Sequence, residues 1–131
     1  MKEVLDTRFL AEYFSSQTTT KEKASRKLKG LINRNEGILP TIVIAEMAKI
    51  TCGRQGKDMA ETHYQALIQS GLQIQNLTPQ IAQHAGLLKC TYQNLPMGDC
   101  IIAATAIISH ARVLSDDPHF DAITEIKRVW I

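Results

Sequence analysis

The chain has 131 residues, a formal net charge of +2, and 44% hydrophobic against 21% charged residues. This composition is typical of one globular domain and excludes a disordered chain. No apolar run has the length of a membrane span, and the opening "MKEVLD" lacks the layout of a signal peptide. We therefore expect one cytoplasmic domain over residues 1–131, without a membrane partner.

The first part of the chain alternates short apolar runs with helical patterns. Residues 3–6 predict a strand, and residues 9–14 predict a short helix after it. Residues 21–33 predict a basic helix with apolar side chains at helical spacing. Residues 37–39 predict a second strand, which Pro40 closes.

The middle of the chain is predicted to be mainly helical. Thr41 is a candidate N-cap for a helix over 42–51, and another helix is predicted over 57–70. The run "LQIQNL", residues 72–77, alternates apolar and polar residues as a third strand would. A Thr-Pro pair then opens a helix over 79–92, because proline is favoured at the first helical position.

The last part of the chain contains the most apolar helix. The run "GDCIIAATAII", residues 98–108, is apolar all round apart from Asp99 and ends near His110, so we expect a helix buried on every face. Residues 112–114 and 127–131 predict two further strands. Strands interleaved with helices predict an α/β fold, a three-layer α/β/α sandwich with a mostly parallel central sheet.

Common catalytic and cofactor motifs are missing from the sequence. The three cysteines form no C-x-x-C pair and are expected to be reduced structural thiols. The four histidines fit no zinc template, and no glycine-rich phosphate-binding pattern occurs. A net charge of +2 is too small to argue by itself for a nucleic-acid partner.

Acidic residues follow several of the predicted strands. In an open parallel sheet, ligands bind outside the carboxyl ends of the strands. Carboxylates predicted at or near that edge are those of Asp6, Glu46, Asp99, Asp116 and Asp117. Such a cluster would repel itself unless a divalent cation lay among the oxygens, and oxygen ligands suit Mg²⁺ or Mn²⁺.

Each acid also has a purely structural interpretation. Asp6 could cap the helix behind it, and Asp117 could cap a turn before Pro118. Glu46 could lie at the wet margin of an amphipathic helix, and Asp99 could favour the positive end of its helix dipole. Four independent structural acids have no reason to converge on one sheet edge, which favours a shared site.

Four segments of the chain resemble the signature segments of PIN-domain nucleases, especially the small VapC-type toxins. They are "VLDTRFL" (4–10), "TIVIAEM" (41–47), "GDCIIAATA" (98–106) and "LSDDPHF" (114–120). The resemblance implies that the catalytic, metal-binding acids are Asp6, Glu46, Asp99 and Asp117. It also implies supporting hydroxyls at Thr7 and Ser115, whereas Arg8 departs from the usual small polar residue and Asp116 is an extra acid that could share the metal site.

The function implied by this resemblance is a metal-dependent endoribonuclease that hydrolyses RNA phosphodiester bonds with Mg²⁺ or Mn²⁺. The implied setting is a toxin neutralised by a small cognate antitoxin, with the toxin itself a homodimer. Segment 21–34 has six basic residues against one acid, and Lys23, Arg26 and Lys27 are its first candidates for contacts with the RNA backbone.

Two alternative functions belong to other classes. A phospho-accepting α/β signalling domain would also keep an acid at a strand end, but this chain lacks an acid pair ahead of Asp6. A non-catalytic PIN-fold module that only binds RNA would not need four intact acids.

Overall fold

A parallel sheet lies at the centre of the computed structural model, which describes residues 1–15 and 18–131. Within these residues the sheet has five strands in the order β3-β2-β1-β4-β5, and every pairing between neighbours is parallel. The strands are β1 (Glu3–Leu5), β2 (Gly37–Pro40), β3 (Gln73–Gln75), β4 (Arg112–Leu114) and β5 (Arg128–Val129). All carboxyl ends of the strands therefore meet at one edge.

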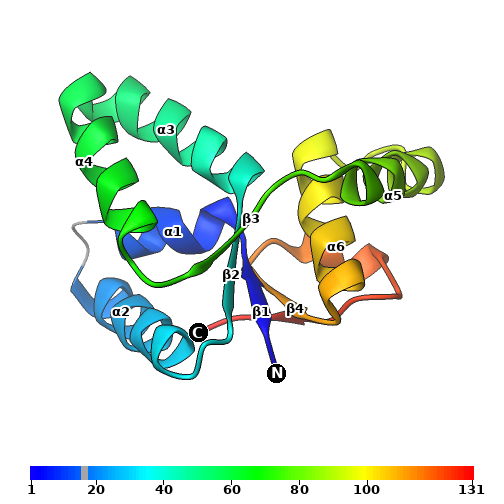
Figure 1. Ribbon diagram of the computed structural model, residues 1–131, viewed down its shortest axis with the longest axis horizontal. Helices are drawn as coiled ribbons and strands as arrows, with labels where there is room; N and C mark the ends of the chain where they lie inside the picture. The colour runs from blue at the N-terminus through cyan, green and yellow to red at the C-terminus, as the bar shows by residue number, and fades with distance from the viewer. Residues whose placement is uncertain (16–17) are drawn as a thin grey trace.

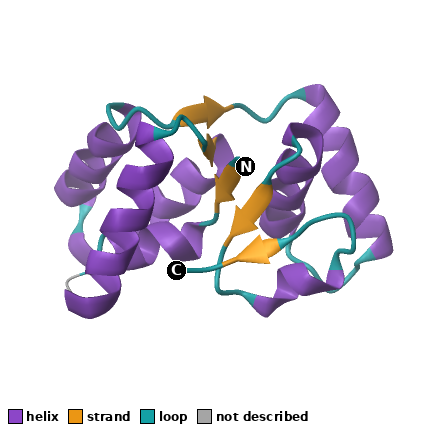
Figure 2. Cartoon of the chain, turned by 90° about the horizontal axis from the view of Figure 1, so that it is seen from below, coloured by secondary structure: helices purple, strands orange, loops and turns teal. Residues whose placement is uncertain are grey.

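Helices cover the sheet on both sides, so the predicted three-layer α/β/α sandwich is confirmed (Figures 1 and 2). One side carries α1 (Thr7–Tyr13), α2 (Thr18–Asn33), α3 (Thr41–Gln55) and α4 (Lys57–Ile68). The other side carries α5 (Pro79–Thr91) and α6 (Met97–Ser109), which pack against each other. A short 3₁₀ helix, η1 (Pro118–Ala122), follows β4. No helix among the described residues is long and apolar enough to span a membrane.

Helix α6 is buried over its middle part, whereas Ile101, Ile107 and Ile108 are only partly buried, so the predicted burial on every face is confirmed for the middle part alone. Residues Ile102 to Ala106 are each no more than 1% exposed, and the helix packs on β1, β4 and α5. Three buried residues of α6 have small side chains, which allows the helix to pack closely against its neighbours. They are Ala103, Ala104 and Ala106. The amino end of α6 is thereby fixed beside the carboxyl ends of β1 and β4.

Some predicted boundaries differ from the structure. Thr41 is the first residue of α3 and Pro40 is its N-cap, so the prediction of Thr41 as the cap is wrong. The helix starts directly from the strand, because proline needs no N–H partner and holds the extended φ of −67° that a cap position requires. At α5 the prediction is confirmed, since the Thr78 hydroxyl accepts a hydrogen bond from the Ile81 N–H at 3.2 Å.

Candidate metal centre

The ends of β1 and β4 hold two of the predicted acids through one hydroxyl. The Asp6 N–H donates to the Leu114 carbonyl at 3.1 Å, which joins the two strand ends. The fully buried Ser115 hydroxyl donates to Asp6 Oδ2 at 2.6 Å and accepts from the Asp117 N–H at 3.0 Å. Ser115 therefore fixes the Asp6 carboxylate and the backbone of Asp117 at the same time.

Glu46 reaches the same edge from α3. The Thr7 hydroxyl, at the start of α1, donates to Glu46 Oε1 at 2.6 Å. Glu46 also lies against the first turn of α6, because a Cβ at Gly98 would come within 3.0 Å of Glu46 Oε2. A glycine at this position leaves room for the carboxylate.

Asp99 lies in the first turn of α6 and faces the other acids. Its pKa is raised to about 6, first by burial and then by the charges of Asp6, Asp117 and Glu46, in that order. The pKa of Asp6 is also raised, mainly by burial, although the Ser115 hydroxyl opposes this shift. At Asp99, burial and repulsion outweigh the favourable dipole of the helix.

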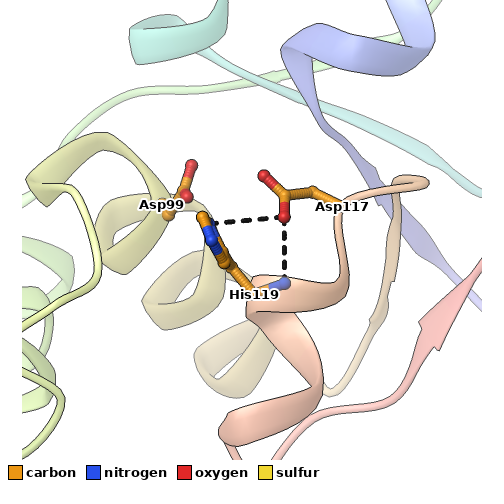
Figure 3. A group of neighbouring side chains, drawn as sticks. All are labelled: Asp99, Asp117 and His119. Carbon is orange, nitrogen blue, oxygen red and sulfur yellow. Dashed lines mark hydrogen bonds and ion pairs between the residues drawn. The ribbon is translucent and has the colours of Figure 1, made fainter.

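Asp99, Asp117 and His119 form the tightest group of candidate ligands (Figure 3). One ligand atom from each of these three side chains lies within 4.8 Å of the others, which is the one such group found among the described residues. Asp6 and Glu46 lie outside this group but close enough to affect the pKa of Asp99. Sequence reasoning missed His119, because it tested the histidines only against zinc templates. Pro118 was the available indication in the sequence, because a turn at this proline brings His119 close to Asp117.

The structural interpretations of the acids can now be decided. Asp117 does cap η1, because Oδ1 accepts from the His119 N–H at 2.9 Å. Asp6 occupies the N-cap position of α1, but its side chain makes no capping hydrogen bond. Asp116 forms an ion pair with Arg8, which accounts for both residues that departed from the expected pattern.

The comparison with protein families decides the classification. The model of the PIN domain family matches residues 4–126. The chain belongs to the PIN-domain family. No curated protein sequence matches it.

Solved structures that are similar to this chain include proteins of toxin–antitoxin pairs. The PIN domain described here superposes on VapBC2 of Rickettsia felis bound to promoter DNA with a TM-score of 0.82, at 18% identity, covering 100% of this chain and 99% of that one. A toxin–antitoxin complex from Klebsiella pneumoniae gives 0.71, at 20% identity and 95% coverage of each chain. VapC20 of Mycobacterium tuberculosis, a Sarcin-Ricin loop cleaving toxin, gives 0.74, at 16% identity, covering 94% of this chain and 95% of that one.

The donor atoms of this PIN domain fit a hard divalent cation. Carboxylate oxygens are the ligands that Mg²⁺ and Mn²⁺ prefer. The pKa of Asp99 is raised first by burial and then by the charges of three neighbouring acids, so these acids add an excess of negative charge around it. A bound cation would remove that excess.

The structure gives Lys27 a role other than contact with a nucleic acid. Its ammonium lies 2.9 Å from Oε1 of Glu3, a carboxylate that is 2% exposed, and Arg112 contacts Oε2 at 2.7 Å. Glu3 is the first residue of β1, at the opposite end of that strand from Asp6. Lys27 therefore neutralises a buried acid far from the candidate site. Lys23 and Arg26 are exposed on the same helix, and their contact with RNA stays a prediction.

A polar pocket adjoins the acids on the side of α1, α3 and α4. Its volume is about 770 Å³. Thr7 and Asp116 border it, and the cations that line it are Arg8, Lys21 and Arg54. Its wall includes Phe14 and His63, whose rings are stacked with centroids 4.1 Å apart. Sequence reasoning did not identify this pocket, because residues from four separate helices, α1 to α4, line it.

Proposed function

We propose that this PIN domain is a metal-dependent endoribonuclease that uses Mg²⁺ or Mn²⁺ to hydrolyse RNA phosphodiester bonds. The observation that carries the proposal is the position of Asp99, half-buried at the head of α6 and facing the charges of Asp6, Asp117 and Glu46. Ordinary helix chemistry does not require three further acids around a first-turn carboxylate. Family membership supports the same reading.

The four acids would hold the cation, and two hydroxyls would position them. Thr7 orients Glu46, and Ser115 orients Asp6 and the backbone of Asp117. The bound cation would supply charge neutralisation at the scissile phosphate and a more acidic attacking water. The carboxylates are held in place just after β1, on α3, on α6 and in the loop after β4.

Water is the expected nucleophile. The two hydroxyls at the site, those of Thr7 and Ser115, donate to carboxylates and are not paired with an imidazole base. These hydroxyls therefore hold the carboxylate oxygens of Glu46 and Asp6 in place, and no covalent intermediate is expected.

The pocket beside Thr7 is the proposed path of the RNA strand. Arg8, Lys21 and Arg54 offer positive charge to phosphates next to the acids, and the Phe14–His63 stack offers a flat surface for a base. This path starts at the acids, whereas Lys27 is held by Glu3 at the far end of β1. Lys23 and Arg26 would contact only RNA that extends beyond the pocket.

We further propose that the enzyme is the toxin of a pair, acts in the cytoplasm as a homodimer, and is neutralised by a small antitoxin. Support comes from its structural neighbours, which include VapBC complexes. Co-expression with the product of a short adjacent reading frame should give a stable complex that lacks ribonuclease activity. Full activity of the co-purified complex would contradict this setting.

Adjacent aspartates provide a matched test of the nuclease proposal. Asp117→Asn keeps the side-chain shape but removes a charge that would hold the cation, so cleavage of labelled RNA pools with Mn²⁺ should fall about 100-fold or more. Asp116→Asn, which breaks only the exposed ion pair with Arg8, should retain most activity. EDTA should abolish cleavage by the parent.

The test also decides between the remaining alternatives. RNA binding without cleavage in Mn²⁺ or Mg²⁺ would show a non-catalytic RNA-binding module. Full cleavage in EDTA would contradict the metal mechanism. A phospho-accepting signalling domain is already excluded by membership of the PIN family.

A further inference from the structure

Among the residues that the structure describes, His119 is the one nitrogen donor grouped with the acids of the proposed cation site, and two of its groups contact the same oxygen of Asp117. Its backbone N–H donates to Asp117 Oδ1 at 2.9 Å, and its ring Nδ1 lies 3.3 Å from the same oxygen. Figure 3 shows the imidazole ring rising from η1 into the space between the two carboxylates. A ligand atom of His119 is within 4.8 Å of one from both Asp99 and Asp117.

The three side chains come from two separate parts of the fold. Asp99 projects from the first turn of α6, whereas Asp117 lies just before η1 and His119 lies within it. The proline at position 118 sits at the first position of η1 and helps to fix the turn. The His119 side chain is 61% exposed, so a hydrated cation can reach it from solvent.

We propose that His119 completes a cation position with Asp99 and Asp117, and that its nitrogen makes this position prefer Mn²⁺ and later divalent transition metals to Mg²⁺. The inference deepens the proposed function, since it rests on the same site binding a cation. Mg²⁺ favours oxygen ligands and keeps several waters, whereas imidazole is a good ligand for first-row transition metals. A set of two carboxylates and one imidazole therefore discriminates between these ions.

A simple ion pair between His119 and Asp117 is the competing interpretation. In that case the ring only balances one carboxylate, and its removal would not change which cation binds. Metal selectivity separates the two interpretations, because an ion pair does not place nitrogen in the coordination sphere.

The experiment uses the full chain, freed of metal with EDTA and dialysed, with no RNA present. Binding of Mn²⁺ is followed by loss of the free-ion electron paramagnetic resonance signal, and Mg²⁺ is measured by competition. His119→Ala removes the ring but keeps the backbone N–H that Asp117 accepts from, so η1 should stay folded. His110→Asn is the matched control, because His110 is exposed at the opposite end of α6 and asparagine tolerates its φ of 52°.

His119→Ala should weaken Mn²⁺ binding about tenfold while Mg²⁺ binding changes less than about twofold. The parent and His110→Asn should keep the same selectivity. Pulsed electron paramagnetic resonance of the Mn²⁺ complex should show coupling to a ligand nitrogen in the parent and in His110→Asn, and none in His119→Ala.

Failure of this inference and failure of the nuclease proposal give different results. If Asp99→Asn loses Mn²⁺ binding but His119→Ala keeps it unchanged, or if nitrogen coupling is absent from the parent, His119 is not a ligand and the nuclease proposal stands. If nitrogen coupling depends on His119 but the parent leaves RNA pools intact, the assignment of His119 stands and the proposed function fails. No Mn²⁺ binding by the parent would overturn the inference.

Discussion

At the scale of single residues, the site depends on how closely Glu46 approaches Gly98. Oε2 of Glu46 lies 3.0 Å from the place that a Cβ at position 98 would take. Thr7 holds the other oxygen of the same carboxylate at 2.6 Å. The position of Glu46 thus combines a hydrogen bond from a hydroxyl on one helix with a close approach to a glycine on another.

Gly98→Ala should separate stability from metal binding. Alanine is favoured over glycine by up to about 1 kcal/mol in a helix interior and by less in the first turn, where Gly98 lies, so the free energy of unfolding should stay the same or rise slightly. The added methyl group should displace Glu46 and weaken the response to Mn²⁺. Thermal melts with EDTA and with Mn²⁺ measure both effects. If Mn²⁺ raised the melting temperature of Gly98→Ala as much as that of the parent, cation binding would not depend on the position of Glu46.

At the scale of elements, α2 and β1 are joined by charge as well as by apolar packing. Leu28 and Leu31 of α2 are buried in the core, while Lys27 on the same helix reaches the buried Glu3 of β1. Arg112 of β4 completes the neutralisation from the other side. A basic helix therefore includes one cation that belongs to the fold.

Lys27→Ala should destabilise the fold, because it leaves a buried carboxylate with one partner instead of two. We expect a loss of about 1–3 kcal/mol in the free energy of unfolding, below the cost of an isolated buried charge since Arg112 remains. Lys23→Ala, an exposed change on the same helix, should stay within about 0.5 kcal/mol. Urea unfolding of both variants measures the difference. Equal stabilities would show that Arg112 alone satisfies Glu3.

At the scale of the whole molecule, the fold gathers carboxylates from four separate segments at one edge of the sheet. The parallel order β3-β2-β1-β4-β5 puts β1 and β4 side by side in the centre. The starts of α3 and α6 flank their carboxyl ends (Figure 1). Folding therefore brings like charges together, and the metal-free protein is expected to be less stable for that reason.

The stability of the metal-free protein should depend on pH through Asp99. Its pKa is about 6 in the fold against 3.8 as a reference, so between these values the folded state binds more protons than the unfolded state. The free energy of unfolding should therefore rise as pH falls through 6, by about 1–2 kcal/mol for a half-buried group, and this contribution should level off below about pH 4. Urea unfolding in EDTA at pH 5 and pH 7 tests this.

Asp99→Asn is the control for that pH dependence. Asparagine cannot titrate, so the variant should gain less stability between pH 7 and pH 5 than the parent. The difference between the two proteins also cancels His63, whose pKa is lowered mainly by burial and which favours the opposite trend. The same pH dependence in both proteins would contradict the role given to Asp99.

Mn²⁺ should stabilise the parent at pH 7 and the Asp99→Asn variant much less. A cation at about 100 times its dissociation constant adds about 2.7 kcal/mol to the free energy of unfolding. Melting temperatures with and without Mn²⁺ check this. An equal shift in both proteins would place the cation away from Asp99.

The sequence by itself determined the layers, the buried helix and the candidate acids. Short apolar runs separated by helical periodicity favour a sheet covered on both faces. The run after Asp99, which is apolar apart from Thr105, favours a buried helix. The acids Asp6 and Asp117 could be predicted because each comes directly after, or close behind, a strand end. Such patterns depend on residues that are close together in the chain, so they can be recognised from the sequence.

Only the tertiary structure decided which charges meet. Three pairs join segments that are far apart in the chain. They are the ion pairs of Lys27 with Glu3 and of Arg8 with Asp116, and the close approach of Glu46 to Gly98. His119 belongs with Asp99 because η1 folds back toward α6, and no local pattern encodes that approach. Charges interact through space over a few ångströms, so their partners depend on the packing of helices and strands and not on the order of residues.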